Sequence, residues 1–405
     1  MASPARPLAS RRVTRGRGPA RTQSMRTRYP APLSPPVLHG EPELAELCGK
    51  ALVHAEEVDR YTHGFHTYPA GLHPLAARDF VEAFPGEGLL DPFCGGGTVL
   101  VEGLIAGRRT IGRDVSPIAL LVSRGRAAAP SAEVVTAFRS AGRKLAALAR
   151  QAGEQPSRTK VERVHGWYAP EAMKELEAIR RGVVHAAPEI QPFLQICFSS
   201  ILVKVSWRKS DTSNRKVVHR RPPGTTAVLF HKKVRELGRA LDGLREAVPE
   251  GTPAADIEQV DARKLAVDQA VDLVVTSPPY PSTYDYVPLQ KLRSVWLGFE
   301  PEEPREIGSR RQFKEGVRWA LKRWLDDTAA WTQRAADALR PGGHMIVVIG
   351  DGLTPAGAID TRAPTEETSA ACGLRLRARA SVQRADHARR THRWEHAFVF
   401  QKDAT

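Results

Sequence analysis

The stretch DPFCGGGT, residues 91–98, decides the fold of this chain. The apolar pair Leu89–Leu90 precedes it, and the helical segment VLVEGLIAG follows it. A glycine-rich turn lets the backbone approach a ligand closely, and the N-terminus of the next helix faces that ligand. The stretch therefore predicts a strand, a glycine loop and a helix that hold a nucleotide-like cofactor.

A second acidic residue supports this interpretation. The segment Thr110–Asp114 has the composition of the next strand, and a carboxylate at its end can accept hydrogen bonds from ribose hydroxyls. The plain dinucleotide fingerprint fails, because Gly95-x-Gly97 is followed by Leu100 instead of a third glycine. A purely structural turn is the alternative, but the strand, the helix and the second acid together favour cofactor binding.

Further along the chain, strand-like apolar segments alternate with segments of helical periodicity. The expected strands are Asp256–Val260, Val271–Val275, His344–Ile349, Leu374–Val382 and Ala397–Gln401. The expected helices are residues 131–152, 170–187, 190–205, 227–247 and 315–339. Strands separated by helices predict an α/β fold with a doubly wound, mostly parallel, Rossmann-like sheet.

We expect four parts along the chain. They are a disordered basic arm over residues 1–40, a first part of the core over 41–124, a largely helical insertion over 125–255, and a second part of the core over 256–405. Ordered structure is expected to start near Glu41. Within the insertion, residues 206–226 are expected to form a polar loop.

The second motif is TSPPY, residues 276–280, directly after an expected buried strand. Two consecutive prolines fix φ and remove two backbone donors, while their carbonyls remain as acceptors. Ser277 adds another acceptor, and Tyr280 offers an aromatic face. Such a loop suits a planar ring that bears an exocyclic amine, although a Pro-Pro pair also serves simply to end a strand.

DPFCGGGT followed by TSPPY closely resembles the motifs of the DNA amino-methyltransferases, the cytosine-N4 and adenine-N6 group. The upstream segment FHTYPAGLHP, residues 65–74, is similar to the one that precedes the glycine loop in some of these enzymes. The resemblance covers about residues 61–120 and 256–350. It implies a Rossmann-like methyltransferase core that uses S-adenosylmethionine on a base flipped out of double-stranded DNA.

The resemblance also implies roles for individual residues. The methionine side of the cofactor would be lined by Asp91, Phe93, Gly95, Gly97 and Thr98. Asp114 would hold the ribose, and Asp261 would lie near the adenine amine. The catalytic residues at the target base would be Ser277, Pro278, Pro279 and Tyr280. Ser277 favours cytosine N4 over adenine N6, because the adenine enzymes usually have Asp or Asn at this position.

The net charge of +15 is concentrated in two segments. Residues 1–40 hold eight arginines and no acid, and residues 204–221 hold seven basic residues against Asp211. The first segment would equally suit a transit peptide, or a chain that starts at Met25. The second predicts contacts with a DNA backbone, a solvated loop being the alternative. The expected DNA-binding residues are Arg208, Lys209, Arg215, Lys216, Arg220 and Arg221.

Composition excludes several other classes. No apolar run is long enough to span a membrane. The four cysteines lie far apart without a CxxC pair, which argues against a disulfide scaffold and a cysteine-based zinc site and fits the reducing cytoplasm. His63, His66 and His73 are expected to pack in loops or beside the cofactor, with no metal. Cys94 is expected to pack, not to act as a nucleophile.

Three alternatives stay open at this point. The chain could methylate RNA or a protein glutamine, or it could be a DNA-binding protein that retains the fold without catalysis. A partner restriction nuclease is compatible with the resemblance but is not encoded in these residues. Residues 284–311 are expected either to cover the active site or to read DNA.

Overall fold

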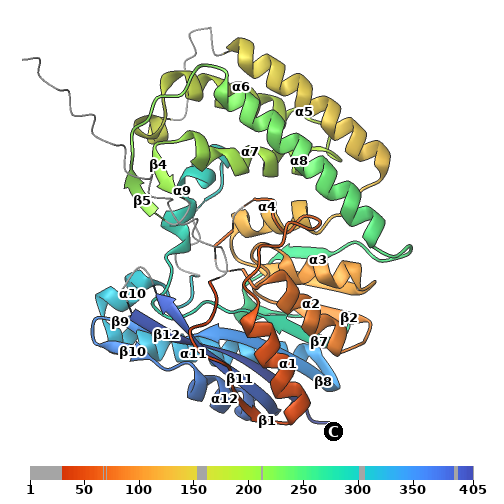
Figure 1. The fold of residues 1–405 in the computed structure, drawn as a ribbon, viewed down its shortest axis with the longest axis vertical. Coiled ribbons are helices and arrows are strands. Elements are labelled where there is room, and N and C mark those ends of the chain that lie inside the picture. Colours follow the sequence, from red (N-terminus) through yellow and green to blue (C-terminus); the bar gives the residue numbers. More distant parts are fainter. Residues whose placement is uncertain are drawn as a thin grey trace, which may run out of the picture.

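The computed structural model describes residues 30–66, 68–69, 71–152, 162–210, 213–300, 306–386 and 391–404. These residues form a lobe built around a large sheet and a second lobe of helices that lies on it (Figure 1). Most of the predicted basic arm lies outside the described residues.

The main sheet has eight strands in the order β1-β11-β12-β8-β7-β2-β3-β6. Five neighbouring strands, β8, β7, β2, β3 and β6, run parallel, whereas β12, β11 and β1 join by antiparallel pairing. Their bounds are β1 Val37–Gly40, β2 Gly88–Asp91, β3 Arg109–Asp114, β6 Asp256–Gln259, β7 Val271–Thr276, β8 Leu339–Gly350, β11 Leu374–Asp386 and β12 Thr391–Lys402. The predicted doubly wound, mostly parallel α/β fold is confirmed.

Successive side chains of a strand point to opposite faces of the sheet, and helices cover both faces here. In β7, Leu273 and Val275 pack towards α1 and α2, whereas Val274 packs towards α11. The helices of this lobe are α1 Pro42–Val53, α2 Pro74–Ala83, α3 Thr98–Ile105, α4 Pro117–Arg126, α10 Arg310–Glu315, α11 Val317–Ala338 and α12 Arg362–Ala371. A short 3-10 turn, η2 Ala262–Lys264, follows β6.

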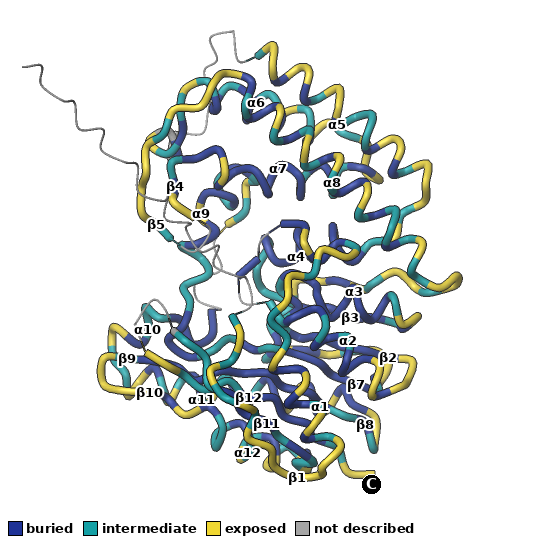
Figure 2. The backbone as a smooth tube through the Cα atoms, in the orientation of Figure 1, coloured by how far each residue is buried: buried dark blue, intermediate teal, exposed yellow. Residues whose placement is uncertain are grey.

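Four long helices build the second lobe, namely α5 Ala132–Ala152, α6 Pro170–Val184, α7 Gln191–Val205 and α8 Thr225–Ala247. The 3-10 turn η1 Glu162–Trp167 precedes α6, and α9 Tyr286–Leu297 packs into the same core through Leu292 and Trp296. α7 is buried almost throughout, as its continuous apolar sequence predicts (Figure 2). This core also contacts α4 through Ile118 and Val122, so the lobe is fixed to the sheet beside the glycine loop.

Two boundary predictions are wrong. Ordered structure starts before Glu41, because Val37–Gly40 pairs with β11 at the edge of the sheet. All four residues of this strand are exposed, so backbone pairing sets its position and no apolar pattern marks it. The expected polar loop 206–226 contains a hairpin of β4 Arg208–Ser210 and β5 Ser213–Lys216.

A second small hairpin, β9 Gly352–Thr354 and β10 Gly357–Ile359, follows β8. Among the described residues, no helix is long and apolar enough to cross a membrane.

Candidate functional site

The glycine loop and the TSPPY loop lie side by side. They follow the carboxyl ends of β2 and β7, which are neighbouring parallel strands. The Thr276 hydroxyl donates a hydrogen bond to Oδ1 of Asp91 over 2.8 Å, and Asp91 Oδ1 also accepts from the Phe93 amide over 3.1 Å. The two motifs that the sequence singles out are therefore joined at the edge where open α/β sheets bind ligands.

The glycine loop is fixed from the neighbouring strand β3. Oδ2 of Asp114 accepts from the Gly95 amide over 3.0 Å, and Oδ1 accepts from the Ser116 amide over 2.8 Å. Gly95 has φ +46°, a left-handed conformation that side chains rarely adopt, and a Cβ there would lie 3.2 Å from the Tyr68 ring. Glycine at this position therefore keeps the loop close to Asp114 and leaves its floor free for a ligand.

A pocket opens between these loops. Of the predicted site residues, it is lined by Asp91, Phe93, Gly95, Thr98, Asp114, Asp261, Ser277 and Pro279. Gly97, Pro278 and Tyr280 are not among the lining residues. Gly97 instead starts α3 in a left-handed conformation, and a Cβ there would lie 3.0 Å from Ser123. Gly97 therefore shapes the turn that leads into α3.

The charged side chains that line the pocket are acidic. It contains five acidic residues, Asp91, Asp114, Asp261, Glu300 and Glu306, and no Lys, Arg or His among the described residues. Burial raises the pKa of Asp91 to about 7 and that of Asp114 to about 6. Asp261 is paired with Arg263, with Nη2 and Oδ2 2.6 Å apart. Such a pocket favours a cationic ligand and disfavours a polyphosphate.

Aromatic and acidic residues that we did not predict complete the pocket. Tyr68 and Tyr286 line it with their rings stacked, 6.4 Å between centroids at 13°. Glu306 accepts from the Tyr286 amide through Oε1 and from Nη2 of Arg311 through Oε2. Tyr68 belongs to the segment whose resemblance we noted, which was a usable signal, whereas Glu306 carries no motif. Described residues within 286–300 and residues 306–307 thus contribute to the lining on the side of α9.

Tyr280 of the TSPPY loop is held away from the lining. Its hydroxyl donates to Oε1 of Glu395 on β12 over 3.0 Å. The Arg393 guanidinium lies 5.6 Å from the centroid of its ring. Glu395 thus contacts the hydroxyl of Tyr280, and Arg393 contacts its ring. Stacking of Tyr280 on a target base stays a prediction.

The basic hairpin β4–β5 divides into structural and exposed residues. Arg208 is buried, and it donates to the Ser213 carbonyl over 2.8 Å and to the Leu289 carbonyl of α9 over 2.5 Å. The prediction that Arg208 contacts DNA is therefore corrected, because its guanidinium ties the hairpin to α9. The other predicted residues are exposed, namely Lys209, Arg215, Lys216, Arg220 and Arg221.

Arg221 makes local contacts, donating to the Lys204 carbonyl over 2.7 Å, and Lys216 lies 4.9 Å from the centroid of the Trp207 ring. Trp207 in turn donates to the His219 carbonyl over 3.1 Å. These local contacts fix the hairpin and the segment after it, which together carry the exposed cations.

The predicted histidine cluster is distributed among separate contacts. His63 Nε2 lies 2.6 Å from Oε1 of Glu102, and His66 Nε2 lies 2.9 Å from the Ser199 hydroxyl. His73 caps the N-terminus of α2, where its Nδ1 accepts from the Leu75 amide.

The four cysteines are free. Burial raises the pKa of Cys94 well above its usual range, which fits the predicted packing role.

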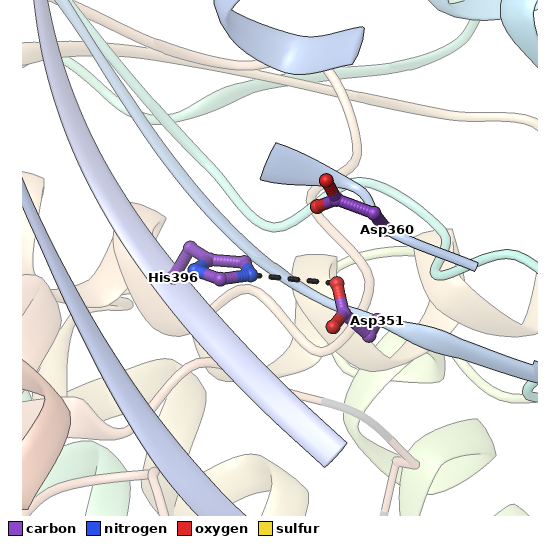
Figure 3. A group of neighbouring side chains, drawn as sticks. All are labelled: Asp351, Asp360 and His396. Carbon is purple, nitrogen blue, oxygen red and sulfur yellow. Dashed lines mark hydrogen bonds and ion pairs between the residues drawn. The ribbon is translucent and has the colours of Figure 1, made fainter. Parts of the chain in front are cut away.

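One group outside the pocket has metal-ligand chemistry. Ligand atoms of Asp351, Asp360 and His396 lie within 4.8 Å of one another (Figure 3). Asp351 Oδ1 already accepts from the amide and the hydroxyl of Thr361, and His396 Nδ1 lies 2.8 Å from the Ser381 hydroxyl. Asp351 and His396 thus belong to a buried polar network that joins β11, β12 and the segments after β8 and β10. Asp360 is exposed and accepts from the Arg362 amide over 2.8 Å.

The fold and the pocket together define a class: a Rossmann-like α/β protein whose ligand pocket lies at the carboxyl ends of parallel strands. Over 274 residues the chain is 27% identical to the type II methyltransferase M.MvaI of Kocuria varians. The alignment spans 61% of this chain and 60% of that relative, so the match covers about three fifths of the relative's length. The chain is a homologue of this type II methyltransferase, and the resemblance that its two motifs predict is confirmed.

No protein-family model matches the chain. Similar solved structures include TrmN from Thermus thermophilus, with a TM-score of 0.34, 13% identity, and coverage of 81% of this chain and 48% of that one. Another is the rRNA methyltransferase aviRa from Streptomyces viridochromogenes, with a TM-score of 0.32, 13% identity, and coverage of 82% and 86%.

Proposed function

We propose that this protein is a DNA methyltransferase that transfers a methyl group from S-adenosylmethionine to an exocyclic amine of a flipped base. Cytosine N4 is favoured over adenine N6 as the target. The observation that carries the proposal is the Thr276–Asp91 hydrogen bond, which joins the glycine loop to the TSPPY loop beside one pocket. Cofactor and acceptor would therefore meet at one point.

The residues of the pocket fit this cofactor. S-adenosylmethionine supplies a methyl group made electrophilic by a positively charged sulfonium. A lining with five acids and no cation among the described residues is suited to that charge. Asp114 would accept from the ribose hydroxyls, and Asp261 lies on the lining where it would face the adenine. The stacked Tyr68 and Tyr286 rings would exclude water from one side.

The TSPPY loop would act on the acceptor amine. The lone pair of an exocyclic amine is delocalised into the ring, so the amine is a weak nucleophile. The Ser277 oxygen and the Pro278 carbonyl would accept its N–H groups and localise the pair for direct attack. No covalent enzyme intermediate is needed, and the raised pKa of Cys94 is consistent with that.

Double-stranded DNA would bind across the lobes, with the exposed cations of the β4–β5 hairpin on its phosphates. The hairpin is fixed to α9 by Arg208, and α9 lines the pocket through Tyr286 and Gln290. The hairpin and this wall of the pocket would therefore be held at a fixed distance by one helix.

Tritiated S-adenosylmethionine offered with duplex DNA, tRNA and protein in separate reactions tests the proposal. Label is expected in DNA alone, and methylome sequencing in a methylation-free host would then report the base and the sequence context. Label in tRNA or in protein, and none in DNA, would show that the substrate is that acceptor and not DNA. Cofactor binding without label in any acceptor would favour a non-catalytic DNA-binding protein.

A further inference from the structure

The hydroxyl of Tyr280 is anchored outside the pocket. Oε1 of Glu395 on β12 accepts its proton over 3.0 Å. Burial raises the pKa of Tyr280, and the Ser277 side chain is a second hydrogen-bonding neighbour that lowers it. The hydroxyl therefore stays protonated and remains the donor to Glu395.

The carboxylate of Glu395 is itself oriented. Arg384 on β11 pairs through Nε with its second oxygen. The same guanidinium donates to the carbonyls of Pro30 and Leu52, each over 2.5 Å. These three contacts fix Arg384, and with it Glu395, to three separate segments of the chain.

The catalytic loop is thus held at both ends. Its first residue, Thr276, is bonded to Asp91 on β2, and its last, Tyr280, is bonded to Glu395 on β12. Between them Pro278 is buried, and Ser277 and Pro279 face the pocket. The prolines stiffen the loop, and the two end bonds fix its place relative to the sheet.

We propose that Glu395, oriented by Arg384, is a positioning residue for the catalytic loop. It places Ser277 and the Pro278 carbonyl through its bond to Tyr280, without touching substrate or cofactor. This inference rests on the proposed function. Reaction geometry is sensitive to displacements of about 1 Å, so release of one end of the loop is expected to lower turnover more than binding.

The test compares Glu395→Ala, Tyr280→Phe and the double variant. Each single change is expected to lower kcat about 10- to 100-fold, with the KM for DNA and the Kd for S-adenosylmethionine within about twofold of wild type. Both changes remove the same hydrogen bond, the one between Tyr280 and Glu395. The double variant is therefore expected to be no slower than the slower single variant. Glu395→Gln keeps an acceptor for the Tyr280 hydroxyl and is expected to recover most of the turnover.

The matched control is Glu41→Gln. Glu41 also pairs with an arginine of β11, Arg377, but at the far end of that strand from Arg384, so wild-type kcat is expected. Multiplying effects of Glu395→Ala and Tyr280→Phe in the double variant, or wild-type kcat in Glu395→Ala, would overturn the proposal.

A readout without catalysis separates this inference from the proposed function. If the wild-type protein methylates no acceptor, the proposed function fails, and the contact is still tested by urea unfolding. Each single variant is expected to lower the unfolding midpoint, and the double variant to lower it no further. Additive shifts would show that Glu395 and Tyr280 do not act as a unit.

Discussion

The pocket and the β4–β5 hairpin both contact α9 and carry opposite charge. Among the described residues, the pocket is lined by five acids and no cation, whereas the hairpin and the segment after it expose five cations. Arg208 connects them by donating to the Leu289 carbonyl of α9. The difference indicates how one chain could bind a cationic cofactor and a polyanion at once, since each ligand is repelled from the other's site.

The comparison also separates two kinds of function. The pocket residues would determine whether and where a methyl group is transferred, and the exposed cations would determine how strongly DNA is held. Substitutions of pocket-lining side chains should therefore leave DNA affinity unchanged, and substitutions of the exposed cations should leave cofactor affinity unchanged.

The largest effect is expected in the TSPPY loop. Pro279→Ala restores a backbone donor and frees φ, and Tyr280→Ala removes the aromatic ring, so either should reduce methylation at least about 1000-fold. The measurement is methyl transfer from tritiated cofactor under single-turnover conditions. Binding of cofactor and of DNA should stay within a few fold of wild type. Normal turnover by the Pro279 variant would remove this loop from the mechanism.

The next effect is expected at the hairpin. Replacing Arg215, Lys216, Arg220 and Arg221 together by Gln should weaken DNA binding about 100-fold at low salt. It should also reduce the slope of log affinity against log salt by about one unit for each lost phosphate contact. The measurement is a salt titration of duplex binding. Cofactor affinity serves as the internal control, and an unchanged slope would leave the hairpin a solvated loop.

A smaller effect, of another kind, is expected at Arg208. Arg208→Gln would leave the Leu289 and Ser213 carbonyls without their charged donor, at a cost of about 2–4 kcal/mol in the free energy of unfolding. Lys209→Gln, one residue further along and exposed, should leave that free energy unchanged. Urea unfolding of the two variants measures the difference. The reverse ranking would return Arg208 to the DNA-contacting residues.

Most of the pocket could be predicted from the sequence, because local patterns encode it. Glycines, an acid at a strand end and paired prolines each impose a backbone geometry within a few residues, and parallel strands bring their carboxyl ends to one edge. Glu306 and Glu395 could not be predicted, since each acts on a residue distant in sequence, Tyr286 and Tyr280 respectively. The burial of Arg208 was missed for the same reason, because a partner on α9 decides it.

The last prediction concerns pH and tests the acidic side of the comparison. Burial raises the pKa of Asp91 to about 7, so the carboxylate is largely protonated at pH 6 and largely ionised at pH 8. Affinity for the cationic cofactor should therefore rise about tenfold between these values.

Asp91→Asn is the matched control, because its amide oxygen can still accept from Thr276 while the side chain no longer titrates. It should remove the pH dependence that Asp91 contributes, and whatever remains belongs to the cofactor or to other groups. Isothermal titration at pH 6, 7 and 8 measures both proteins. The same slope in wild type and variant would contradict the assignment.

The stability of the cofactor-free protein should change in the opposite direction. The folded-state pKa of Asp91 lies above its unfolded value of about 4, so its contribution is fully present below pH 4 and is lost as pH rises through 7. Without cofactor, the free energy of unfolding should fall from pH 5 to pH 8, and Asp91→Asn should flatten that decline. The cationic ligand should therefore bind more tightly at the pH where the cofactor-free protein is less stable. This opposition is expected when a carboxylate is buried in order to bind a cation.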